Sequence, residues 1–330
     1  MKTFYCQIVR PTLKGVGQIA LINSALTGAL FLIALLFHDL NRFDFDEHAL
    51  VFLQSSVLIA TLFGALASLA TAYLIRANYD HIKQGLYGYN GALLGLASAT
   101  FFMPSESLAL LVFIGSAFTS LAMHTWRWKV SPFTFPFLIT IAFIFHIAPL
   151  FELSLREYLI PTIEEPISTV LQYSTSLLNG IGQVLFQSGL LFSVIILIGI
   201  AASSLKTGLW TLIGTSIGLA FGVVVTILEG GIFEAAFINS IITGTDSFDT
   251  VSQGLYGFNG ALITLALCQS ESYSKMTIIL GAISASILTW VGYLFDMTLF
   301  TFPFVLSAWL VTTWAKKRNT SPNIGEETLN

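Results

Sequence analysis

"QGLYGYNGALLGLA" at residues 84–97 returns as "QGLYGFNGALITLA" at residues 253–266, 169 positions further along the chain. Neither copy contains a charged residue, and both are rich in glycine. A long phrase that recurs in this way predicts a chain built from two related halves. The role of the phrase within each half depends on the sequence around it.

The surrounding sequence is that of a membrane protein. Of 330 residues, 55% are hydrophobic and only 10% are charged, and the mean hydropathy is +0.81. A soluble domain carries about a quarter charged residues, so this composition excludes an ordinary soluble protein. The sequence shows no basic patch of the size that nucleic acid requires, so no nucleic-acid partner is expected. The expected surroundings are the lipid bilayer of a cell (inner) membrane.

Ten apolar segments divide the chain into two sets of five. They are residues 18–37, 50–75, 84–102, 108–126 and 133–151, and then 183–205, 207–228, 253–268, 276–295 and 299–314. Long apolar runs predict an all-α, multi-pass fold. The first run lacks a small-residue cleavage pattern after it, so it is interpreted as a retained span.

The expected organisation has four parts. They are a first repeat at residues 1–151, an extracellular or periplasmic connecting segment at 152–180, a second repeat at 181–315 and a polar cytoplasmic tail at 316–330. Residues 229–247 are interpreted as a surface or partly dipping segment within the second repeat.

The distribution of charge assigns a side to each loop. With a cytoplasmic N-terminus and alternating crossings, 12 of the 14 Lys and Arg residues fall in cytoplasmic segments, while acidic residues collect outside. This bias follows the positive-inside rule. Because five crossings is an odd number, the second half enters from the opposite face. The sequence therefore predicts two inverted-topology repeats, with both termini in the cytoplasm.

Two further motifs recur in the same order. "GQIALI" at residues 17–22 is echoed by "GQVLFQ" at residues 182–187, and "TFPF" at residues 134–137 returns at residues 301–304. The Asn-Gly pair in the glycine-rich phrase predicts a turn, and hence a break in a helix within the membrane in each half. Irregular backbone at membrane depth requires a protein- or water-lined path. Two such breaks therefore predict one central pore.

The apolar segments hold almost no ionisable side chains, which points to a neutral solute and passive flow. His124 and His146 lie near segment ends and are interpreted as interfacial or packed residues. The two cysteines predict no disulfide framework, and no Cys/His cluster predicts a metal site or cofactor. The candidate polar groups are those of Gln18, Gln183, Thr134 and Thr301.

At these motifs the sequence resembles the urea transporter family, over residues 17–314. The resemblance implies two inverted repeats of five spans, each with a re-entrant pore half-helix, and a homotrimer with one urea pore in each protomer. It implies that Gln18 and Gln183 bond urea at the two ends of a filter, with Thr134 and Thr301 at its centre. The implied apolar lining is Ile19, Val184, Leu21, Phe186, Tyr89, Phe258, Leu93 and Leu262, which form the narrow centre and flat slots for a planar molecule.

The two halves differ within these motifs. Leu21 stands where the family has an aromatic slot wall, and Tyr89 replaces a phenylalanine, so the first slot is expected to differ from the second. A facilitator of another small neutral solute, such as a short amide, ammonia or water, remains an alternative. A membrane enzyme is not expected, because the spans lack clustered acid, base or metal-ligand residues.

Overall fold

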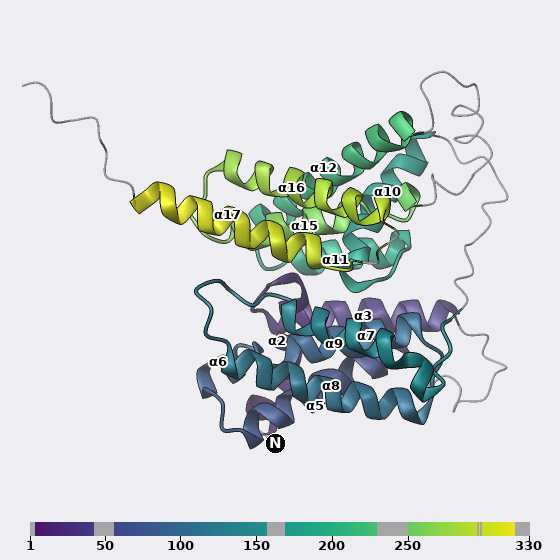
Figure 1. Cartoon of the computed structure of the whole chain (residues 1–330), viewed down its shortest axis with the longest axis vertical. Helices are drawn as coiled ribbons and strands as arrows, with labels where there is room; N and C mark the ends of the chain where they lie inside the picture. The colour runs from purple at the N-terminus through teal and green to yellow at the C-terminus, as the bar shows by residue number, and fades with distance from the viewer. Residues whose placement is uncertain are drawn as a thin grey trace, which may run out of the picture.

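The computed structural model describes residues 4–42, 56–156, 169–229, 250–295, 297 and 299–320. Within these ranges the regular structure is helical, and an isolated bridge joins Phe102 to Leu155. Figure 1 shows the helices in two groups, one from each half of the chain. The predicted all-helical class is confirmed.

The first group contains short helices as well as long ones. Its elements are η1 (Tyr5–Val9), α2 (Arg10–Gly17), η2 (Gln18–Ala20), α3 (Ala25–Arg42), α5 (Val57–Leu74), α6 (Tyr79–Lys83), α7 (Gly88–Phe101), α8 (Glu106–Thr125), α9 (Phe135–Ile147) and η3 (Ala148–Phe151).

The second group repeats most of this order. Its elements are α10 (Thr169–Gly182), η4 (Gln183–Leu185), α11 (Leu190–Ala201), α12 (Leu205–Glu229), α15 (Gly257–Cys268), α16 (Lys275–Leu294) and α17 (Phe302–Thr320). Helix α10 begins inside the segment 152–180 that sequence reasoning gave to the connection. Helix α17 continues to Thr320, past the expected start of the polar tail. Most of the segment 229–247 lies outside the described residues.

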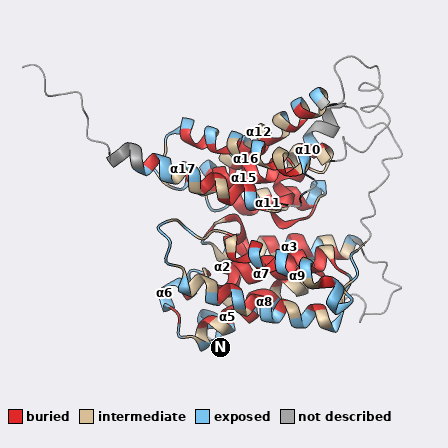
Figure 2. Ribbon diagram, viewed as in Figure 1, coloured by how far each residue is buried: buried red, intermediate tan, exposed pale blue. Residues whose placement is uncertain are grey.

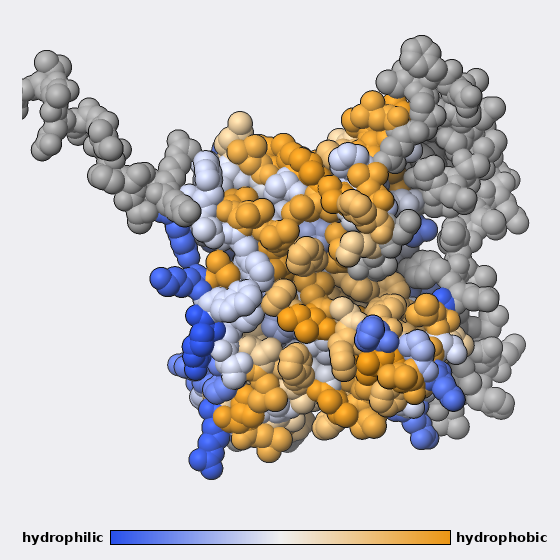
Figure 3. Space-filling view, viewed as in Figure 1, coloured by the Kyte–Doolittle hydropathy of each residue, from blue (hydrophilic) through white to orange (hydrophobic). Residues whose placement is uncertain are grey.

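The helices suit a membrane. Five of the described helices are long and apolar enough to cross one, or seven if each of two bent pairs counts as a single span. Large apolar side chains such as Phe63, Phe113 and Phe118 are exposed on α5 and α8. Figure 3 shows hydrophobic residues over much of the visible surface. These observations confirm a multi-pass membrane protein.

The glycine-rich phrase forms the central helix of each group. Residues 88–100 of α7 are all buried, and so are the first nine residues of α15, 257–265. Figure 2 shows buried residues gathered inside each group and exposed ones outside. The phrase is thus a core helix rather than a surface one.

Glycine permits the neighbouring helix to approach this core helix closely. A Cβ on Gly64 of α5 would collide with the carbonyl of Gly91, and one on Gly214 of α12 would collide with that of Gly260. Helices that lack side chains at a crossing can bring their backbones together, as small residues do in membrane bundles. The pairs α5–α7 and α12–α15 are therefore built in the same way.

The sharpest helix breaks lie elsewhere than expected. Between residues 5–20 and 25–41 the chain bends by 78°, and between residues 174–185 and 190–201 by 67°. Leu21 and Phe186 take left-handed conformations at these bends, with φ of 60° and 54°. The turn predicted at Asn90-Gly91 is wrong, because both residues lie inside α7; the turn comes earlier, at Gly85 (φ 77°).

Candidate functional site at the contact between the two halves

Two threonines meet where the halves touch. The hydroxyl oxygens of Thr134 and Thr301 are 2.7 Å apart and joined by a hydrogen bond, and each side chain is 1% exposed. Each residue directly precedes a helix, α9 or α17, and follows a phenylalanine with φ of 46°. The structure therefore brings together the two threonines that the repeated TFPF motif singled out. We call them the threonine pair.

The prolines of the TFPF motifs start these helices rather than break them. Pro136 lies in the first turn of α9 and Pro303 is the second residue of α17. A proline is tolerated there because the first N–H groups of a helix have no partner within it. The threonine hydroxyls thus stand at helix N-termini.

An asparagine from the glycine-rich phrase fixes each of these N-termini. Asn90 Oδ1 accepts the N–H of Phe137 at 3.2 Å, and its Nδ2 donates to the Phe133 carbonyl at 3.5 Å. In the second half, Asn259 Oδ1 accepts the N–H of Phe304 at 3.2 Å and its Nδ2 donates to the Phe300 carbonyl at 3.3 Å.

These bonds satisfy helix N–H groups that have no partner within the helix. They also determine where each threonine lies relative to the core helix. Sequence reasoning took Asn-Gly as a turn signal and missed this role, although the duplication of the asparagine was the available clue.

The two glutamines begin the short helices at the bends. Gln18 is the first residue of η2 and Gln183 of η4, and both side chains are buried. Gln18 Nε2 donates to the carbonyl of Gln84, the first residue of the glycine-rich phrase, at 3.2 Å. The amide of Gln18 therefore joins the bend to the start of the core helix in its own half.

Each bend is also bonded to the opposite half. Gln269 Nε2 donates to the Leu21 carbonyl at 3.1 Å, and Gln187 Nε2 donates to the hydroxyl of Thr100 at 2.8 Å. Thr100 and Gln269 occupy corresponding positions near the ends of α7 and α15. We call this pair of contacts the cross-half bonds. They hold the bend of each half against the core helix of the other.

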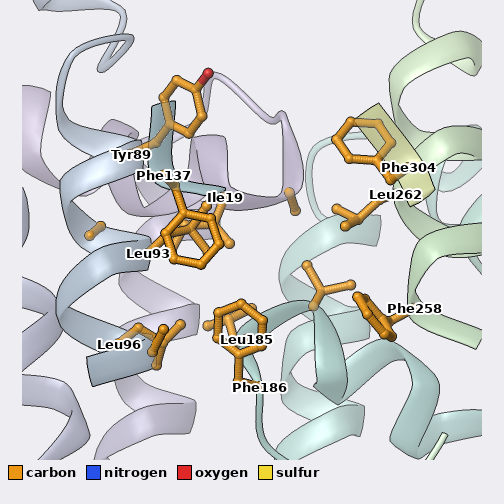
Figure 4. Packing of buried hydrophobic residues seen from close by; sticks show 14 of the residues in the cluster. Ile19, Tyr89, Leu93, Leu96, Phe137, Leu185, Phe186, Phe258, Leu262 and Phe304 are labelled. Atoms are coloured by element: carbon orange, nitrogen blue, oxygen red, sulfur yellow. The ribbon is translucent and has the colours of Figure 1, made fainter. Parts of the chain in front are cut away.

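The predicted apolar lining residues gather in one buried cluster. Ile19, Val184, Leu93 and Leu262 are each 1% exposed, Tyr89, Phe258 and Phe186 are buried, and Leu21 is half-buried against them. In Figure 4, Ile19 and Leu93 lie beside Phe137 on one side, and Leu262 lies beside Phe304 on the other. The cluster thus draws on both halves.

The aromatic neighbours of Phe186 were missed by sequence reasoning. The Phe186 ring lies 5.9–6.0 Å from the rings of Phe101, Phe137 and Phe300, measured between centroids. Phe137 belongs to the repeated TFPF motif and Phe300 directly precedes its second copy, so the motif contained a signal for them. Phe101 had none, because its counterpart in the second half is Ser270.

Tyr89 and Phe258 differ in one bond. The Tyr89 hydroxyl donates to the Phe133 carbonyl, the same oxygen that Asn90 approaches. Phe258 has no hydroxyl, and Asn259 instead also donates to Thr289 Oγ1 at 3.1 Å. The Tyr89 hydroxyl therefore supports the backbone next to Thr134.

The chemistry of this site is neutral and weakly polar. In the described part of the chain, no group of three His, Cys, Asp or Glu side chains could hold a metal ion. The polar groups are hydroxyls, amides and backbone carbonyls, surrounded by flat aromatic and aliphatic side chains. Such groups can exchange hydrogen bonds with a small uncharged molecule, and the apolar cluster disfavours ions.

Comparisons with known proteins agree with this chemistry. A family model described as "Urea transporter" matches residues 9–316. The chain is 25% identical over 275 residues to "Urea transporter 1" of Ovis aries, and equally to that of Capra hircus. Each alignment covers 79% of this chain and 63% of the relative, so the chain spans less than two thirds of these relatives' length.

Proposed function

Since the chain belongs to the urea transporter family, whose members are transporters rather than enzymes, we propose that it conducts urea passively, down the urea gradient. The observation that carries the proposal is the threonine pair, two buried hydroxyls 2.7 Å apart where the halves meet. Hydroxyls both donate and accept, so they suit a molecule that has N–H groups and a carbonyl.

Urea must lose most of its hydrating water molecules to enter so narrow a site. Moving an amide-like group into apolar surroundings without partners costs roughly 2–7 kcal/mol. In the proposed path the threonine hydroxyls replace part of that water at the centre. Gln18 and Gln183 contribute amides at the two ends. The flat apolar side chains around them select a planar solute and bind it weakly enough for release.

We further propose that the two groups of helices are inverted repeats related by a pseudo-twofold axis. Paired backbone features support this. Left-handed residues recur at Leu21 and Phe186, at Phe133 and Phe300, and at Gly85 and Gly254, where φ is 77° in both cases. The repeat boundaries, the homotrimer, the inner membrane and the cytoplasmic termini inferred from the sequence form part of the same proposal.

Flux into liposomes tests the function directly. Purified protein is reconstituted, and uptake of urea is compared with that of thiourea, acetamide, glycerol and water, with protein-free liposomes as the baseline. The proposal expects urea to enter much faster than the baseline, with no accompanying current because urea is uncharged. If urea enters only at the baseline rate while another solute enters faster, that other solute, and not urea, is the transported substrate.

A further inference from the structure

A cavity of about 570 Å³ lies away from the threonine pair. It is lined by Cys6, Arg10, Lys14, Tyr79, Asp80, Lys83 and Gln84. The lining comes from η1, α2 and α6, with Gln84 directly after α6, and Figure 1 shows α6 near the N-terminal part of the chain. Its volume is within the range of small-molecule sites.

The lining is strongly cationic. Three of its seven side chains are basic and one is acidic. Lys83 has neighbours of its own, because its Nζ is 3.7 Å from Asp80 and 4.2 Å from the centre of the Tyr79 ring. No ion pair joins Arg10 or Lys14 to an acidic group among the described residues. They are also one turn apart on the same helical run, where like charges repel.

The scaffold does not require these charges. The motif 17–22 corresponds to 182–187, and the phrase 84–97 to 253–266, so Arg10, Lys14 and Lys83 correspond to Thr175, Asn179 and Ser252. There Asn179 Nδ2 donates to the Ser252 carbonyl at 2.9 Å, and the same fold is built with neutral groups. The positive-inside rule accounts for cations on the proposed cytoplasmic side of the membrane, but not for the gathering of three of them around one cavity, which attracts anions and so indicates an anionic ligand.

We propose that this cavity binds a phosphate-bearing anion, either a free organic phosphate or the headgroup of an anionic lipid. Arg10 and Lys14 supply the charge-assisted hydrogen bonds that phosphate oxygens accept. Lys83 and the Tyr79 ring line the same cavity. Gln84 also lines it and its carbonyl accepts from Gln18, so an occupied cavity would act on the end of the proposed urea path. The effect on the urea path rests on the proposed function, whereas binding of the anion to the cavity does not.

Cys6 offers a direct reporter of occupancy. It is exposed and lines the cavity, whereas Cys268 is buried elsewhere and serves as an internal control. The rate of alkylation by uncharged iodoacetamide is measured at each cysteine by peptide mass spectrometry. Three conditions are compared at constant ionic strength. They are protein in phosphatidylcholine nanodiscs without pyrophosphate, the same nanodiscs with pyrophosphate, and protein in phosphatidylglycerol nanodiscs.

Bound anion is expected to slow alkylation of Cys6. With pyrophosphate at ten times its dissociation constant, about one site in ten stays empty and the rate falls about tenfold. Arg10→Gln and Lys14→Gln should each abolish this protection, while Lys275→Gln, a cation outside the cavity, should keep it. A thermal-shift measurement with the same anion confirms that each variant is folded.

The outcomes separate the ligands. Protection by pyrophosphate in phosphatidylcholine assigns a free phosphate, and protection in phosphatidylglycerol alone assigns a lipid headgroup. Equal rates in all three conditions would overturn the proposal, as would protection that survives both Arg10→Gln and Lys14→Gln. Urea flux is not a readout in this test, so a failure here leaves the transport proposal untouched.

Discussion

The hydroxyls of Thr134 and Thr301 satisfy each other when no solute lies between them. On the proposed path, an entering solute would replace their mutual bond by bonds to itself, and the mutual bond would reform behind it. This exchange limits the favourable free energy of solute binding, because the bond between the two threonines is lost when their bonds to the solute form. Weak binding of this kind favours rapid passage over retention.

Replacing Thr134 by valine should slow urea entry. Valine keeps the shape but removes one of the two hydroxyls that would replace urea's water at the centre of the path. A hydrogen bond left unmade to desolvated urea costs roughly 1–3 kcal/mol, so we expect a reduction in urea flux of about tenfold. Liposome uptake measures it. Thr140→Val is the control, because the Thr140 hydroxyl bonds the Pro136 carbonyl of its own helix, and equal losses in the two variants would argue against the proposed role.

At this scale the sequence was most informative where it repeats itself. Both threonines stand in copies of one four-residue motif, which marked them as candidates, and the resemblance to the urea transporter family implied that both lie at the centre of a filter. Phe101 could not be, because it has no counterpart aromatic, and its neighbours come from helices distant in the sequence. The Tyr89 hydroxyl was recognised as a difference between the halves, but its partner is a backbone carbonyl, which no sequence pattern marks.

At the scale of the element, Gly85 connects two helices that the chain places far apart. With φ of 77°, it adopts a conformation that side chains disfavour, and a Cβ there would collide with the backbone of Gly15 in α2. Gly254 meets Gly180 in the same way. The half-helix before each bend therefore rests on the turn that starts the core helix.

Gly85→Ala should destabilise the protein by more than the roughly 1 kcal/mol of conformational strain, since backbone must also move. We expect a marked fall in thermal stability and in the yield of folded protein from detergent. Gly88→Ala is the matched control, because its Cβ would lie at an ordinary 3.6 Å from the nearest atom. Equal stability of the two variants would contradict this account of the phrase.

Asn90→Leu should also lower stability, through the start of α9. It removes the acceptor of the Phe137 N–H and a donor to the Phe133 carbonyl, which costs roughly 1–3 kcal/mol. Ser98→Ala on the same helix is the control, since the buried Ser98 hydroxyl has no partner in the described structure. The midpoint of thermal unfolding is measured for both variants. It is expected to fall for Asn90→Leu and to stay unchanged for Ser98→Ala. An unchanged midpoint for Asn90→Leu would exclude the role of Asn90 at the start of α9.

Helix positions were easier to predict than helix breaks. The long apolar runs located the main helices, because burial of apolar surface dominates their placement. The bends at Leu21 and Phe186 were missed, since neither residue is a glycine and local propensity argues against their left-handed conformation. Contacts from the other half, such as the Gln269 bond to Leu21, stabilise that conformation, and they are not local in sequence.

At the scale of the whole molecule, the proposed inversion makes equivalent loops face opposite sides. Met103 follows α7 and is 50% exposed, and the corresponding position after α15 is the exposed Ser272. In a Cys6→Ser background, we expect a cysteine at position 103 to react with a membrane-impermeant maleimide from outside intact cells. A cysteine at position 272 should react only after the membrane is opened. Labelling of both from one side would refute the inversion.

The cross-half bonds have a mechanical consequence. A carrier that rocks one half against the other would have to break the Gln187–Thr100 and Gln269–Leu21 contacts in every cycle. A fixed aperture breaks neither. Transport through such an aperture should resemble diffusion through a sieve, with a rate proportional to the concentration difference and with only a shallow dependence on temperature. On the proposed function, the size and shape of the aperture are set once, during folding, and each passing molecule exchanges hydrogen bonds with the threonine pair.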